Sequence, residues 1–277
     1  MPAAGWRDST RSTAAPNRPS SLAPAVPAEL KVTLLQHTPS PERAVASAGR
    51  LCYAPVSAAS LKSSMDDQEV RRLVGGLARS GHLSAFEHVS FTFAVDGISR
   101  ACSHQLVRHR VASYSQQSQR YVRFGSDEDF IIPPSIDGSP EARAVFYRAM
   151  DDARRAYDQL VELGLAEGRE RSAVFEDARF VLPNAAETKI VVTMNARELR
   201  HFFSLRCCRR AQWEINRLAW AMRHLAISVA PLLFQSTGPG CLGAGCPEGK
   251  MSCGEPFAEA TVAAMDFSRT VAGLDSE

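Results

Sequence analysis

The chain has 277 residues, of which 45% are hydrophobic and 22% charged, and its formal net charge at pH 7 is +2. This composition supplies enough apolar material for the core of a globular protein, as one large domain or two small ones. A net charge so close to zero excludes a surface built throughout for nucleic acid, and no apolar run approaches the roughly 20 residues of a membrane span. Neither nucleic acid nor a membrane is therefore an expected partner.

Residues 1–29 are rich in Ala, Ser, Pro and Arg and are predicted to form a disordered extension. Their acid-poor composition leaves an organelle transit peptide open as the alternative. The sequence starts without the apolar core of a signal peptide, and its seven cysteines are an odd number. We therefore expect mostly reduced thiols and a cytoplasmic location.

Residues 30–235 carry the signals of one ordered domain. KVTLLQH at 31–37 predicts a short strand, and helical patterns follow over 41–49 and 66–80, the second ending at Gly81. HVSFTFAV at 88–95 alternates apolar with more polar residues, which is typical of a strand with one buried face. The segment 98–110 has helical spacing, so several arginines are expected to emerge at the end of a helix.

The second half of this domain is predicted to be mostly helical. Helices are expected over 141–164 and over 168–181, the latter ended by Pro183, and the β-branched segment 187–194 predicts a second strand. Asn195 stands at an N-cap position with Glu198 three residues on, as in a capping box. Helices over 196–206 and 210–233 follow, and the tail 236–277 is expected to be weakly ordered.

An acid-free basic stretch is the clearest functional signal. Between Gly97 and Ser126 the chain has no Asp, Glu or Lys, but it has five arginines: Arg100, Arg108, Arg110, Arg120 and Arg123. Guanidinium groups pair bidentately with phosphate or carboxylate, so the stretch points to a small anionic ligand. The hydroxyls and amides of SYSQQSQR at 113–120 suit a nucleobase edge or a sugar. The alternative is that these arginines cap helix carbonyls or pair with acids distant in the sequence.

A second basic group lies further along the chain, within residues 197–210. It comprises Arg197, Arg200, Arg206, Arg209 and Arg210. Two separated basic clusters indicate one composite ligand site.

The basic stretch resembles the signature of the flavin-dependent thymidylate synthases. Arg108-His109-Arg110 is followed by Ala112-Ser113 and then by Ser118-Gln119-Arg120-Tyr121, as in that signature. The segments at 81–93, 179–183, 194–206 and 211–215 are similar to family segments in the same order, over about residues 31–235.

This resemblance implies an α+β fold with a central sheet flanked by helices, in a homotetramer whose four subunits build each site jointly. It implies a methyltransferase that makes dTMP from dUMP in nucleotide biosynthesis, with residues 30–235 as its catalytic domain. The carbon donor would be 5,10-methylenetetrahydrofolate, the reductant NADPH, and the hydride carrier bound FAD. The alternative is an RNA-binding module that uses an Arg-rich aromatic surface.

The resemblance also implies roles for individual residues. Arg206 would stabilise the negative charge that develops on the uracil ring. The dUMP site would comprise Gln105, Leu106, Val107, Arg108, Gln116, Gln117, Ser118, Gln119, Arg120, Arg179 and Arg206. The FAD contacts would be Ser84, Arg108, His109, Arg110, Gln116, Asn195, Ala196, Arg197 and His201, with His82 at the face where folate and NADPH enter.

Two positions depart from the family pattern. Ser115-Gln116 stands where many members have Asn-Glu, and His201 stands where many have Asn. Gln116 keeps the carbonyl acceptor of Glu but not its charge, so a contact with a sugar hydroxyl survives better than a role as a base.

The cysteines of the tail form a spaced cluster. Cys241, Cys246 and Cys253 are arranged as C-x4-C-x6-C, and Cys207-Cys208 could approach them. A structural metal or a regulatory disulfide is the alternative, and free thiols with no metal are the expectation.

Overall fold

The computed structural model describes residues 28–125, 130–242, 245–258, 265–267 and 270–271. Nearly all of the expected N-terminal extension, 1–29, lies outside this part, and the domain boundaries at 30 and 235 stay predictions. A four-stranded antiparallel sheet lies at the centre, with the strand order β1-β2-β4-β3. Its strands are β1 (Lys31–His37), β2 (Ser90–Ser99), β3 (Ala112–Gln116) and β4 (Glu187–Asn195).

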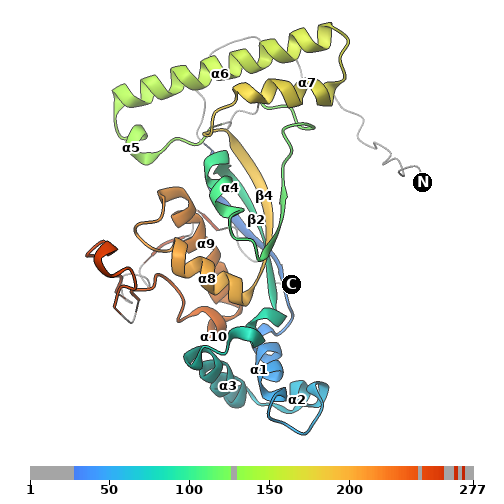
Figure 1. Cartoon of the computed structure of the whole chain (residues 1–277), viewed down its shortest axis with the longest axis vertical. Coiled ribbons are helices and arrows are strands. Elements are labelled where there is room, and N and C mark those ends of the chain that lie inside the picture. The colour runs from blue at the N-terminus through green and yellow to red at the C-terminus, as the bar shows by residue number, and fades with distance from the viewer. Residues whose placement is uncertain (1–27, 126–129, 243–244, 259–264, 268–269, 272–277) are drawn as a thin grey trace, which may run out of the picture.

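The helices fall into three groups around this sheet (Figure 1). At one end lie α1 (Pro41–Leu51), α2 (Ala58–Ser64), α3 (Asp67–Ser80) and the 3-10 turn η1 (Leu83–His88). At the other end lie α5 (Pro134–Asp137), α6 (Pro140–Ala166), α7 (Arg171–Ala178) and the 3-10 turn η2 (Arg179–Val181). Beside the sheet lie α4 (Arg100–Leu106), α8 (Ala196–Arg206), α9 (Trp213–Val229) and α10 (Pro231–Phe234), and the tail carries the 3-10 turn η3 (Gly249–Met251). The expected α+β class with a central, helix-flanked sheet is confirmed.

The alternating pattern of β2 produces the core. Phe91 and Phe93 are fully buried and pack in one cluster with Phe202 and Leu218. On the opposite face, the hydroxyls of Thr92 and Thr193 lie 2.9 Å apart and link β2 to β4. The predicted strand with one buried face is therefore confirmed. This strand pairs with β4, and α8 begins at the residue that follows β4.

The predicted helix over 98–110 is wrong at both ends. Ile98 and Ser99 belong to β2, which continues past a bulge at Gly97 (φ 70°), whose N–H donates to Glu187 Oε1 at 3.0 Å. Helix α4 begins only after Ser99, whose hydroxyl accepts from the N–H of Cys102 at 3.0 Å. The arginines nevertheless follow the end of a helix, as expected.

Other differences also have local physical causes. β3 was not predicted because its residues 112–116 are polar on both faces, and pairing with β4 supplies its order. The expected helix over 210–233 breaks at Ala230 (φ −147°), where Pro231 begins a separate short helix. The last residues of the expected helix over 168–181 form the 3-10 turn η2.

The described part of the tail is more ordered than expected. Phe257 is buried, with its ring centroid 5.4 Å from that of Trp220. Val271 forms an isolated parallel bridge with Val32 of β1. The expectation of weak order is therefore wrong for these residues. Across the described ranges, every helix is too short or too polar to cross a bilayer.

Candidate functional site

The signature loop between α4 and β3 presents two exposed arginines. Arg108 and Arg110 point to solvent on either side of His109, which is buried. In the part of the chain that the structure describes, neither guanidinium has an acidic partner within 4 Å. Two neighbouring unpaired guanidinium groups favour an incoming anion.

Two other arginines of the basic stretch pair with acids that are distant in the sequence, which was the alternative to ligand binding. Arg120 Nε lies 2.9 Å from Glu176 Oε2, and Arg123 lies 2.8 Å from Asp158. Both acids stand on the distant helices α6 and α7. Arg179 shares Glu176 at 3.6 Å, so that one carboxylate holds Arg120 and Arg179 together.

One hydrogen bond connects Arg206 to the signature loop, and a second connects the same histidine of the loop to Glu198. Its Nε donates to His109 Nε2 at 3.1 Å, and His109 Nδ1 lies 3.2 Å from Glu198 Oε1. We call Arg206, His109 and Glu198 the anchoring triad. Burial is the largest influence on His109 and lowers its pKa, although the hydrogen bond with Glu198 opposes this effect. His109 is therefore neutral at pH 7.

The expected capping box is half right. Asn195 Oδ1 accepts from the N–H of Glu198 at 2.8 Å, as an N-cap does. The Glu198 side chain, however, turns to His109. The tertiary partner thus replaces the local one.

The expected FAD residues lie mostly at the end of the sheet where α8 begins. Arg197 forms an ion pair with Glu87 of η1, the turn that also carries Ser84 and follows His82. The exposed His201 has its ring centroid 6.1 Å from that of His109. Ala196, by contrast, is fully buried, as is Leu106 of the expected dUMP set. Neither residue exposes any surface to a ligand in this chain.

Gln116 is oriented by two buried hydroxyls. Its Nε2 donates to Ser103 Oγ at 3.0 Å and to Thr188 Oγ1 at 3.1 Å. Both amide hydrogens are thus used toward the protein, and Oε1 is left as the acceptor. This orientation suits the sugar contact expected of a Gln at this position.

The second basic group does not act as one cluster. Arg200 donates to the carbonyl of Leu233, and Arg210 donates to that of Met251. Arg209 donates to the carbonyl of Glu255 at 3.1 Å. These three guanidinium groups hold backbone segments, although Arg209 and Arg210 also line one cavity with Arg206. That the two basic groups form one composite site stays a prediction.

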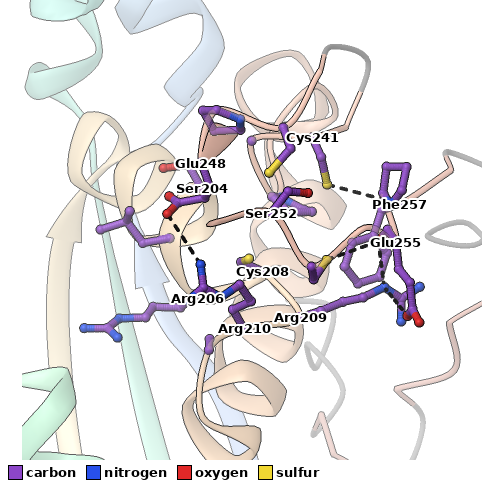
Figure 2. Close-up of a pocket in the computed structure, with 18 residues that line it drawn as sticks. Ser204, Arg206, Cys208, Arg209, Arg210, Cys241, Glu248, Ser252, Glu255 and Phe257 are labelled. Carbon is purple, nitrogen blue, oxygen red and sulfur yellow. Dashed lines mark hydrogen bonds and ion pairs between the residues drawn. The ribbon is translucent and has the colours of Figure 1, made fainter. Parts of the chain in front are cut away.

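A cavity of about 330 Å³ lies between the end of α8 and the tail (Figure 2). Arg206 lines it together with four thiols, those of Cys208, Cys241, Cys246 and Cys253. All seven cysteines are free thiols, and within the described ranges no three His, Cys, Asp or Glu side chains are placed to hold a metal ion. The expected dUMP residues other than Arg206 lie outside the lining of this cavity.

Two thiols near Arg206 lack the properties of a nucleophile. Cys102 and Cys207 are fully buried, and burial raises the pKa of both thiols far above the ordinary value. A thiol nucleophile needs a lowered pKa and access to its target. Neither residue meets these conditions.

Two residues that hold the candidate site in place are not identified by the sequence patterns. Asn216 Nδ2 donates to the carbonyls of Arg206 at 2.8 Å and Cys208 at 3.0 Å, and so holds the end of α8. Glu198 was interpreted only as a cap. Its spacing of four residues from the buried Phe202 was the available signal that it lies on the inner face of α8.

Comparison with known proteins gives a consistent result. The family model described as thymidylate synthase complementing protein matches residues 33–232. A flavin-dependent thymidylate synthase of Geobacter sulfurreducens is 55% identical over 227 residues, which cover 82% of this chain and 94% of the relative. Another from Clostridium tetani is 49% identical over 234 residues, with coverage of 82% and 94%.

Among solved structures, the chain is similar to a UMP/dUMP methylase, PolB from Streptomyces cacaoi, whose crystal structure is bound with 5-Br dUMP. The TM-score is 0.65 at 28% sequence identity, and the match covers 76% of this chain and 94% of that chain. These similarities give no support to the RNA-binding alternative.

Proposed function

The chain belongs to the thymidylate synthase complementing protein family, that of the flavin-dependent thymidylate synthases, and from this membership we propose that it methylates dUMP to dTMP with bound FAD. The names of its relatives supply the flavin dependence, and the solved neighbour is a UMP/dUMP methylase. We include in the proposal 5,10-methylenetetrahydrofolate as the carbon donor and NADPH as the reductant. The observation that carries it is the pair Arg108 and Arg110, which have no acidic partner among the described residues, beside Arg206, which the anchoring triad holds.

The described residues fit an anionic dinucleotide such as FAD. Arg108 and Arg110 have guanidinium groups without acidic partners, which suits a pyrophosphate. Ser84, Arg197 and His201 would complete this site from η1 and α8. When bound, FAD supplies the hydride, while the protein binds and orients the reactants.

The dUMP phosphate would meet the guanidinium groups that share Glu176. Arg120 and Arg179 are already brought together by that carboxylate, at 2.9 and 3.6 Å, so little reorganisation is needed for both to contact one phosphate. Gln116 would accept a hydrogen bond from a sugar hydroxyl through its free carbonyl oxygen. The neighbouring residues of the proposed dUMP site are Gln105, Leu106, Val107, Arg108, Gln117, Ser118 and Gln119.

Arg206 would act on the base. Its Nε donates to His109, which sets the direction of the guanidinium, and its two terminal nitrogens donate to no protein group among the described residues. A guanidinium held in this way stabilises negative charge on a uracil oxygen without reorganising at the moment of reaction. Gln116 cannot ionise, so the residues favour electrostatic stabilisation over a strong protein base.

We also propose a homotetramer with shared sites. Within one chain, Arg206 lines the cavity by the tail, while Arg120 and Arg179 lie with α7. Sites assembled between subunits would let these groups act on one nucleotide. A cytoplasmic location stays a prediction.

The purified protein tests this proposal directly. We expect it to copurify with FAD, to bleach under anaerobic NADPH, and to form dTMP only when dUMP and methylenetetrahydrofolate are also present. A colourless protein that takes up no FAD and binds single-stranded RNA with a steep salt dependence would support the RNA-binding alternative instead.

A further inference from the structure

The anchoring triad links the first and last turns of α8 through the signature loop. Glu198 lies in the first turn of α8 and Arg206 at its last residue, eight residues later, or about 12 Å along the axis. The imidazole of His109, from the signature loop, spans this gap with contacts of 3.2 and 3.1 Å. Neither contact is explained by local helix geometry.

The hydrogen bonds determine where the proton of His109 lies. Arg206 Nε–H can only donate, so His109 Nε2 must accept and carries no proton. The single proton of the neutral ring is therefore on Nδ1 and is donated to Glu198. An imidazolium would place a second N–H against that of Arg206, and the bond between them would break.

The surroundings hold the ring in place. His109 packs edge-on against Phe202, with ring centroids 4.9 Å apart at 84°, and Tyr114 Oη donates to the carbonyl of His109 at 2.8 Å. The titratable or charged groups that face the ring are Glu198, Arg206 and His201. Glu198 and His109 are 9% and 6% exposed, so water has little access to replace either partner.

Arg206 is held differently from the other arginines near it. Arg200, Arg209 and Arg210 each donate to a backbone carbonyl, whereas the guanidinium of Arg206 donates through Nε to a side chain, that of His109. In the described part of the chain, its terminal nitrogens donate to no protein group. The bond with His109 thus sets the direction of the guanidinium while leaving its fork open to a ligand.

We infer that Glu198 is a positioning residue for thymidylate formation, because it fixes the Nδ1–H form of His109 that orients Arg206. This inference rests on the proposed function. It also gives His109 a role in holding Arg206 that is separate from any contact with flavin, since both ring nitrogens are engaged within the protein.

Three variants separate this role from simple packing. His109→Phe keeps the ring against Phe202 but loses both hydrogen bonds, whereas His109→Gln retains an amide that can accept from Arg206 and donate to Glu198. In Glu198→Gln the side-chain amide can turn and donate to His109 Nδ1, which favours the tautomer with its proton on Nε2. We expect His109→Phe and Glu198→Gln to lower kcat at least tenfold, with the Kd for dUMP and the FAD content changed less than threefold. His109→Gln should recover part of the lost kcat.

Two further readouts belong only to positioning. In an Arg206→Lys background, His109→Phe should cost less than an additional twofold in kcat, because the residue that it orients is already altered. The wild-type kcat should fall at acid pH as His109 is protonated, and His109→Phe should lack this acid limb. Glu42→Ala serves as the structural control, since Glu42 Oε1 accepts from the N–H of Leu232 at 2.7 Å between α1 and α10. It should lower the melting temperature without changing kcat or the pH profile.

The inference is overturned if His109→Phe keeps kcat within twofold of wild type, or if its effect is fully additive with Arg206→Lys. If the wild-type protein forms no thymidylate, the proposed function fails separately, and ¹⁵N spectra of the histidine rings then decide the inference. A His109 resonance of the Nδ1–H form that changes in Glu198→Gln supports it, and an Nε2–H form in the wild type refutes it.

Discussion

Replacing Arg206 by Lys tests the residue on which the proposed chemistry depends. In the native protein, Arg206 bonds to His109 through Nε at 3.1 Å and keeps its terminal nitrogens open. A lysine retains one positive charge but has a single nitrogen at its end and no planar fork. That ammonium group cannot hold His109 and also present two donors to a uracil oxygen.

The size of the effect follows from the loss of one preorganised donor. Such a loss costs about 10²–10³ in turnover, or about 2.7–4 kcal/mol of barrier. His109 Nε2 would also lose a partner in a buried setting, which adds a stability cost of about 1 kcal/mol. The FAD content should be unchanged, because the proposed flavin residues lie in η1, in the first half of α8 and in the signature loop.

The assay is dTMP formation from saturating dUMP, methylenetetrahydrofolate and NADPH, with FAD per chain measured after denaturation. Arg209→Lys is the matched control, because Arg209 follows shortly after α8 and lines the same cavity but is held by the carbonyl of Glu255. It should retain turnover within threefold. Arg206→Lys with wild-type turnover and a full complement of FAD would refute the role given to Arg206.

Three further predictions concern stability and the absence of a thiol nucleophile. Gly97→Ala should lower the free energy of unfolding by at least about 2 kcal/mol, because φ is 70° and a Cβ would overlap a backbone carbonyl. Gly76→Ala, in open space within α3, should raise it by about 0.4–1 kcal/mol; equal denaturation midpoints for the two would contradict the argument. Cys102→Ala and Cys207→Ala should each keep turnover within about tenfold, or about 1.4 kcal/mol of barrier, and abolished turnover with FAD and dUMP still bound would rule out a mechanism without an enzymic thiol. The pKa of His109 is lower in the folded chain than in the unfolded chain. As the pH drops below about 6.5, the unfolded chain therefore binds a proton at this histidine before the folded chain does, and the free energy of unfolding should fall. His109→Phe should remove that part of the fall, and an unchanged pH slope in the variant would contradict the assignment.

The sequence patterns correctly predicted the features that depend on residues close together in the chain. The alternation in β2 identified its buried face, and Gly81 was correctly placed as the end of α3, where its φ of 73° suits a residue without a Cβ. Asn195 was correctly predicted as the N-cap of α8. Each of these signals is complete within a few residues.

Contacts between distant segments could not be predicted in this way. Ser99 ends β2 and caps α4 while its own N–H donates to Glu214, 115 residues away, at 2.6 Å. Glu198 contacts His109, 89 residues away, and not the N–H of Asn195 that a capping box would give it. The pairing of Arg120 with Glu176 likewise depends on how α7 packs, which no periodicity encodes.

Thymidylate formation by the FAD-loaded protein is the decisive test of the proposed reaction. The protein would be stripped of FAD, incubated with dUMP, methylenetetrahydrofolate and NADPH, and the nucleotide analysed by mass spectrometry before and after FAD is restored. We predict dTMP only when FAD and NADPH are both present. An FAD-loaded protein that leaves dUMP unchanged under these conditions, or dTMP formed without FAD, would contradict this prediction.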